Sequence, residues 1–201
     1  MLVNLILISL GILAYLFFCW RRLKDDYPAN QVFSASLIIL CSAFVFSQVF
    51  KHFVSGWWFW GGISGILIAF CVSVYKYKLK FYENLEAFGI GFLIILAMIF
   101  FSDSVIASSI SSLGFFLIIL ALIILFFVME MKYKELSWYK SGKIGFSGLF
   151  ILGLFFMIRS LIAIVYPHML SYLVTFSLLD AILSALVSLT MFLVLYKLSK
   201  S

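Results

Sequence analysis

Two ionisable side chains, Arg159 and Asp180, interrupt the last two long apolar stretches of the sequence. A charge in hydrocarbon is costly, so each raises a functional question. Arg159 lies seven residues before Tyr166 and Asp180 twelve after His168. In antiparallel helices their depths would differ by about 6–8 Å, which a long arginine side chain can bridge. Arg159 therefore indicates either an ion pair with Asp180 that fixes helix register or a cationic site for an anionic lipid headgroup. For Asp180 the ion pair is the favoured interpretation.

A glycine-rich run, Gly61-Gly62-Ile63-Ser64-Gly65, directly follows the aromatic residues 57–60 at the start of another apolar stretch. Glycines four residues apart are typical of helices that pack closely in membranes. The same bare backbone would also let a lipid phosphate approach the free N–H groups of a first helical turn. Spacing leaves both interpretations open, with packing favoured on spacing alone.

Two further acidic residues lie near the ends of one apolar stretch. Asp103, at the end opposite the basic loops, is expected to be a solvated helix end or to line the same cavity as Arg159. Glu86, at the other end, is expected to be solvated or to extend its carboxylate towards water.

The remaining reactive side chains form no pattern that indicates metal or cofactor chemistry. Cys19, Cys41 and Cys71 fall in three separate apolar stretches, and His52 and His168 lie at their ends. Metal sites and disulfides need side chains at matched spacing, so we expect inert thiols and no metal or cofactor. The sequence also contains no zinc-protease motif, no Walker motif and no plausible catalytic triad.

The elements that must position these residues are transmembrane helices. The chain is 66% hydrophobic and only 11% charged, far from the usual composition of a soluble domain. A bilayer core about 30 Å thick requires about 20 apolar residues of helix. Seven segments meet this criterion and predict an all-α, polytopic membrane protein with a single helical domain over residues 1–201: about Leu2–Trp20, Val32–Phe50, Trp58–Tyr75, Leu85–Phe101, Leu113–Met131, Ile144–Tyr166 and Leu170–Tyr196.

The basic residues orient this predicted bundle. Apart from Lys51 and Arg159, every Lys and Arg follows the first, third, fifth or seventh segment. The positive-inside rule therefore predicts an N-terminus outside the cell and a cytoplasmic C-terminus. The net charge of +6 reports this orientation, and we expect no nucleic-acid partner. The first apolar run precedes its basic residues, which favours a retained helix over a signal peptide.

Several stretches resemble the bacterial prolipoprotein diacylglyceryl transferases. Trp60-Gly61-Gly62-Ile63-Ser64-Gly65 is similar to that family's HGGLIGG-type stretch, and the loop 76–81 is similar to its basic loop. Residues 153–159, ending in Arg159, resemble its YGLFRF segment, and residues 180–184 its GQILS-like run. Seven helices with the same orientation also match.

The resemblance implies a plasma-membrane enzyme that moves diacylglycerol from phosphatidylglycerol to a lipobox cysteine thiol at the outer leaflet. Its partners would be membrane lipids and a preprolipoprotein. Arg159 would be the catalytic, phosphate-facing residue. The lipid-binding residues would be Trp60, Gly61, Gly62, Gly65, Asp103 and Asp180.

Departures from the family pattern leave an alternative. The family's His before the two glycines is Trp60 here, and its second arginine would fall near residues 99–103, where this sequence has none. The alternative is a catalytically inactive relative that binds anionic lipid or a lipoprotein precursor, or a subunit of a membrane complex. A transporter or channel is disfavoured because few ionisable groups lie in the apolar segments.

Overall fold

The protein is an all-helical bundle in the computed structural model, which describes residues 2–54, 56–132, 146–165 and 177–200. Each of the seven helices in these ranges is long and apolar enough to cross a membrane. In chain order they are α1 (Leu2–Leu23), α2 (Ala29–Phe53), α3 (Trp58–Tyr77), α4 (Phe81–Ala107), α5 (Ile110–Lys132), α6 (Phe146–Val165) and α7 (Ser177–Lys200).

Short connections reverse the chain between the first five helices. Pro28 precedes α2 with a φ of −64°, which its ring fixes and which suits the residue before a helix. Gly56 lies between α2 and α3 with a φ of 93°, a value that glycine adopts without steric cost. Lys78 and Ser108 end α3 and α4 in the left-handed conformation. These turns make successive helices antiparallel, and α1 with α2, α2 with α3 and α4 with α5 are also neighbours.

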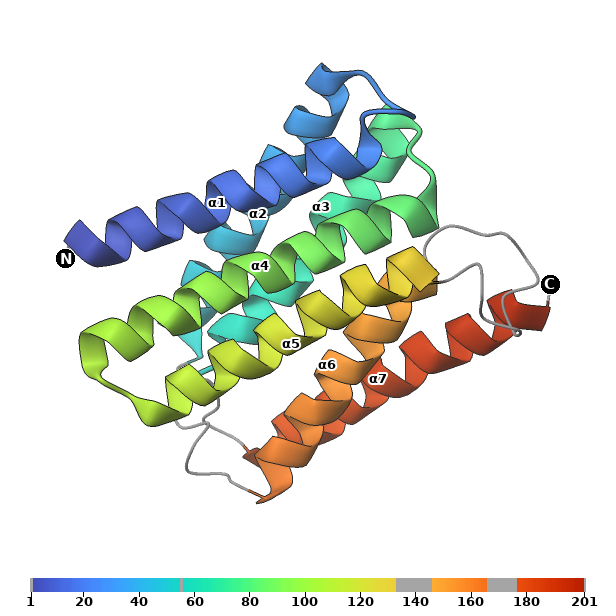
Figure 1. The fold of residues 1–201 in the computed structure, drawn as a ribbon. Helices are drawn as coiled ribbons and strands as arrows, with labels where there is room; N and C mark the ends of the chain where they lie inside the picture. Colours follow the sequence, from blue (N-terminus) through green and yellow to red (C-terminus); the bar gives the residue numbers. More distant parts are fainter. Residues whose placement is uncertain (1, 55, 133–145, 166–176, 201) are drawn as a thin grey trace.

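Helix α4 is central to the bundle. It packs against α1, α5 and α6, whereas α2 packs chiefly on α3 and α7 on α6. Figure 1 shows α1 alongside α4 although two helices separate them in the chain, and it shows the two termini at opposite ends of the bundle. Helices α1, α3, α5 and α7 all end at the same side, which we call the basic end because their last turns carry Lys or Arg.

Two large apolar clusters fill most of the bundle, and a small third cluster lies between α6 and α7. The larger one joins α3, α4, α5 and α6 and includes Phe59, Leu93, Phe126 and Phe155. The second joins α1, α2, α3 and α4 around Tyr15, whose hydroxyl donates to the Ser36 carbonyl oxygen at 3.2 Å. Outside these clusters large apolar side chains remain exposed on the helix surfaces, as expected where lipid replaces water.

The seven predicted apolar helices are confirmed, with some differences in their bounds. Helix α4 is longer at both ends than the predicted Leu85–Phe101, so Glu86 lies in its second turn. Part of the predicted Ile144–Tyr166 and Leu170–Tyr196 segments lies outside the described residues, as does the connection around His168. Asp180 lies in the first turn of α7.

Candidate functional site

Arg159 and Asp180 form a buried ion pair at the end of the bundle opposite the basic end. Arg159 lies six residues before the end of α6 and Asp180 in the first turn of α7. Arg159 Nη2 donates to Asp180 Oδ1 at 2.8 Å, and the two side chains are 5% and 4% exposed. Of the two interpretations left open by the sequence, the ion pair is therefore present, although the predicted lipid-binding role remains a prediction.

The hydrogen bonding of this ion pair is incomplete. Asp180 Oδ1 accepts a second hydrogen bond from Trp60 Nε1 at 2.5 Å. Asp180 Oδ2 and Arg159 Nε are both buried, and neither has a hydrogen-bond partner within the described ranges. A guanidinium carries five N–H donors in a planar fork that suits bidentate binding of an anion. Among the described residues, Asp180 engages Arg159 through Oδ1 alone, and Arg159 Nε has no acceptor.

Aromatic rings from α3 cover the ion pair. The guanidinium carbon of Arg159 lies 3.7 Å from the centre of the Phe59 ring, a cation–π contact. The Trp60 ring stacks on Phe156 at 6.2 Å between centroids, which fixes the indole that donates to Asp180. We call Arg159, Asp180, Phe59 and Trp60 the Arg159 cluster. Sequence reasoning missed Phe59, whose only signal was its place among three tryptophans.

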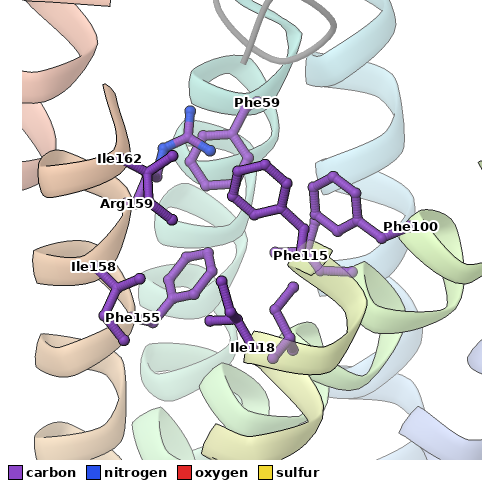
Figure 2. Close-up of a pocket in the computed structure, with 10 residues that line it drawn as sticks. Phe59, Phe100, Phe115, Ile118, Phe155, Ile158, Arg159 and Ile162 are labelled. Carbon is purple, nitrogen blue, oxygen red and sulfur yellow. The ribbon is translucent and has the colours of Figure 1, made fainter. Parts of the chain in front are cut away.

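A pocket lies beside Arg159 between α3, α4, α5 and α6. Apart from Arg159 its lining is apolar: Phe59, Leu96, Phe100, Phe115, Ile118, Ile119, Phe155, Ile158 and Ile162. Figure 2 shows the guanidinium at one end of the pocket beside the Phe59 ring, with Phe155, Ile158 and Ile118 farther from it. Phe100 and Phe115 stack at 5.2 Å and form the wall from α4 and α5. The pocket thus combines a single cation with a hydrocarbon-like wall.

The glycines of α3 pack against α2. A Cβ atom at Gly61 would lie 2.6 Å from the Phe50 side chain, and one at Gly65 would lie 2.6 Å from the Ser42 carbonyl oxygen. Ser42 Oγ also donates to the Gly65 carbonyl oxygen at 2.9 Å. These two positions therefore have the packing role left open by the sequence. Gly62 is less crowded, with its nearest neighbour at 3.8 Å from such a Cβ atom.

Asp103 lies apart from the pocket lining. It is half-buried near the end of α4 and accepts a hydrogen bond from Ser112 Oγ on α5. Ser109 Oγ contacts Ser112 Oγ at 3.2 Å in the same turn. The local role of Asp103 is thus to join the ends of α4 and α5. Of the predicted site residues, the structure brings together Arg159, Asp180 and Trp60.

A second ionic cluster lies near the basic end. Arg22 of α1 forms ion pairs with Glu86 of α4, at 2.5 Å, and with Glu130 of α5. The other Glu86 oxygen accepts from Ser147 Oγ at 3.3 Å and from the Gly148 backbone N–H at 3.2 Å. We call these five residues the Arg22 cluster.

The expectation that Glu86 is solvated is wrong, because its side chain is 0% exposed. Gly148 of α6 explains how Glu86 fits: a Cβ atom there would overlap the Glu86 side chain and backbone, so its absence makes room for Glu86 of α4. Every Glu86 oxygen has a partner. This cluster joins four helices and leaves no part of Glu86 open to a ligand.

The thiols and imidazoles stay separate. Cys19 is buried on α1, whereas Cys41 and Cys71 are exposed on α2 and α3. His52 lies on the exposed end of α2, and His168 lies outside the described residues. Within the described ranges no three His, Cys, Asp or Glu residues are grouped as they would be around a metal ion.

Comparisons with known proteins leave the family open. The chain matches no protein-family model, no curated protein and no solved structure. The resemblance to the diacylglyceryl transferases therefore stays a prediction that depends on the sequence motifs around Trp60, Arg159 and Asp180.

Proposed function

We propose that the protein binds anionic membrane lipid, with phosphatidylglycerol as the first candidate. In this proposal the lipid phosphate contacts Arg159 beside the apolar pocket, and the lipid tail stays in the surrounding membrane. One observation carries the proposal: a buried guanidinium, whose Nε has no partner among the described residues, lies at the end of a pocket whose other lining residues are apolar. That combination suits a molecule with an anionic group attached to a hydrocarbon chain.

The energetics favour such a ligand. A buried donor without a partner costs about 1–3 kcal/mol, and a phosphate oxygen at Arg159 Nε would recover this cost. Charge-assisted hydrogen bonds from arginine to phosphate are short and strong. Phe59, against one face of the guanidinium, would keep the cation in place while the headgroup binds at its edge.

The proposed location is the outer leaflet of a bacterial plasma membrane. The last turns of α1, α3, α5 and α7 carry Arg21, Lys76, Lys132 and Lys197 among others. By the positive-inside rule this basic end is cytoplasmic, the N-terminus is outside and the C-terminus is inside. Arg159, at the opposite end, would then meet lipid headgroups from the outer leaflet.

Diacylglyceryl transfer is a second candidate. In that reaction a lipobox thiol sulfur bonds to the glycerol carbon, the bond from that carbon to the phosphate oxygen breaks, and glycerol phosphate leaves. The thiol must lose a proton, since a free cysteine has a pKa of about 8.5. The observation that favours this candidate is Asp180 Oδ2, a carboxylate oxygen of the same cluster that accepts no hydrogen bond from the described residues and could take up a proton.

Lipid binding can be tested with purified protein in detergent micelles. We expect native mass spectrometry and titration to detect phosphatidylglycerol binding in preference to phosphatidylcholine. Arg159→Gln should abolish that preference because it removes the buried cation. Arg21→Gln is the matched control: Arg21 is exposed in the last turn of α1, and its loss should leave the preference intact. Equal preference in Arg159→Gln and wild type would contradict the proposal.

Turnover separates the two candidates. Purified protein, phosphatidylglycerol and a lipobox peptide should yield diacylglyceryl-peptide and glycerol phosphate if the protein is a transferase. Specific lipid binding without product, under conditions in which an active diacylglyceryl transferase works, would leave lipid binding as the function.

A further inference from the structure

The ion pair of the Arg159 cluster occupies part of the surface that an anionic headgroup needs. Arg159 Nη2 already donates to Asp180, whereas Nε has no partner in the described part of the chain, so an incoming phosphate finds one arm of the guanidinium in use. The phosphate would also lie next to the Asp180 carboxylate. Two like charges at such a distance inside a bundle of low dielectric constant repel each other. Asp180 therefore acts against the ligand in two ways.

Asp180 is held where it is by groups other than Arg159. Trp60 Nε1 donates to its Oδ1, and the Trp60 ring is itself stacked on Phe156. The backbone that follows is tied to α6, because Ser160 Oγ donates to the Ala181 carbonyl oxygen at 2.9 Å. The carboxylate therefore cannot move aside at low cost when a ligand enters the pocket.

We infer that Asp180 is an internal competitor for Arg159 that weakens the binding of anionic lipid. This inference rests on the proposed function of the Arg159 cluster. Asp180 neutralises the buried cation when the pocket holds no lipid, and the headgroup must displace or share that neutralising contact. The affinity for anionic lipid thus depends on how much more strongly Arg159 interacts with the phosphate than with Asp180. Because this difference is small, the bound lipid can exchange with lipid in the membrane.

A different role for Asp180 makes the opposite prediction. If the carboxylate only held Arg159 in the orientation that a phosphate requires, its removal would weaken lipid binding. If it competes, its removal leaves Arg159 buried without a counter-ion. The phosphate of an anionic lipid can then interact with the guanidinium without competition, so the lipid binds more tightly. The sign of the change in affinity therefore separates competition from positioning.

The test is Asp180→Asn in the full chain, with phosphatidylglycerol and phosphatidylcholine as probes in detergent micelles. Asn keeps an acceptor oxygen for Arg159 and Trp60 and removes only the charge. We expect the dissociation constant for phosphatidylglycerol to fall by about tenfold or more, with that for phosphatidylcholine unchanged. Asp180→Ser, a second neutral variant, should change the affinity in the same direction. Unchanged or weaker binding of phosphatidylglycerol to both variants would overturn the inference.

Thermal unfolding gives a readout that also works if the variants are less stable. Phosphatidylglycerol should raise the unfolding temperature of Asp180→Asn by more than it raises that of wild type, because the lipid supplies the missing counter-ion. A smaller or equal rise would count against competition. Asp26→Asn is the matched control: it removes an acidic partner from Lys80 at the basic end and should leave lipid binding as in wild type.

Failure of the inference differs from failure of the proposed function. If wild type prefers phosphatidylglycerol and Arg159→Gln loses that preference, the proposed function stands. Equal or weaker binding to the neutral Asp180 variants then rejects competition alone. If wild type shows no preference for phosphatidylglycerol, the proposed function fails and the inference fails with it.

Discussion

The two ionic clusters of the bundle differ in how completely their polar atoms are matched. In the Arg22 cluster one arginine faces two carboxylates, and both Glu86 oxygens have partners. In the Arg159 cluster one arginine faces one carboxylate, and each of the two side chains keeps a buried atom that has no partner in residues 2–54, 56–132, 146–165 and 177–200. Buried polar groups in native proteins are nearly always hydrogen-bonded, so an unfilled pair calls for an explanation.

The surroundings of the two clusters differ as well, since the Arg159 cluster borders a pocket. Glu86 is enclosed by the Gly148 backbone, and the partly exposed Arg22 and Glu130 side chains complete that cluster. Arg159 instead borders an apolar pocket. A filled cluster that joins α1, α4, α5 and α6 is explained by the assembly of the bundle. A half-filled cluster beside a pocket is better explained by a ligand.

The largest expected effect is on the Arg22 cluster. Arg22→Met leaves Glu86 fully buried without a cation, which should lower the free energy of unfolding by about 3–5 kcal/mol. Denaturant unfolding in detergent micelles measures the change. Arg21→Met, on the exposed side of the same turn, should change stability by less than about 0.5 kcal/mol. A loss for Arg22→Met as small as that of the control would mean that Glu86 reaches water.

The Arg159 cluster should behave differently when both charges are removed. Arg159→Met alone leaves the buried Asp180 without a cation and should lower the free energy of unfolding by about 3–5 kcal/mol. Arg159→Met combined with Asp180→Asn removes both charges and keeps an acceptor for Trp60, so stability should return to within about 1–2 kcal/mol of wild type. The double variant should nevertheless show no phosphatidylglycerol preference. A double variant as unstable as the single one would assign the pair a structural role like that of the Arg22 cluster.

The membrane helices were predictable because each is a long run of apolar residues, and hydropathy needs no knowledge of tertiary contacts. Basic residues follow every second apolar run, and this pattern was sufficient to predict that successive helices run in opposite directions. The sequence also predicted the ion pair between Arg159 and Asp180 as one of two alternatives, because their segments are consecutive and antiparallel.

The polar partners from distant helices were not predictable. Glu86 meets Arg22 from 64 positions away and Gly148 from 62 positions away, so its position near a helix end suggested solvent instead. The hydrogen bond between Trp60 and Asp180 joins residues 120 positions apart. Such contacts depend on which helices pack together, and α1 on α4 is a pairing that chain order does not suggest.

A smaller effect is expected from the glycine that makes room for Glu86. Gly148→Ala places a Cβ atom within the space of the Glu86 side chain, so α4 and α6 must shift, at a cost of about 1–3 kcal/mol. Gly114→Ala on α5 is the matched control, because nothing lies within 4 Å of its added Cβ atom. That control should be more stable than wild type by about 0.5–1 kcal/mol. Similar unfolding curves for the two variants would contradict the close packing of the Arg22 cluster.

The smallest effect is expected from exposed ion pairs at the basic end, which give a baseline for both buried clusters. Lys80 Nζ contacts Asp26 at 3.0 Å and Glu83 at 3.3 Å. The hydrogen bond to Asp26, followed by that to Glu83, raises the pKa of Lys80 above 10.5. Because the pKa is higher in the folded protein, this contribution to stability is complete below pH 10.5 and is lost as the pH rises through the folded-state pKa.

The pH dependence of Lys80→Met tests this baseline. Its stability difference from wild type should be small and constant from neutral pH to about pH 9, and should shrink at pH values above the ordinary lysine pKa of about 10.4. Lys78→Met is the control, since Lys78 makes no ion pair within the described part of the chain and should give no such change. If Lys80→Met proved as destabilising as Arg22→Met, burial would not be what separates the strong clusters from the weak one.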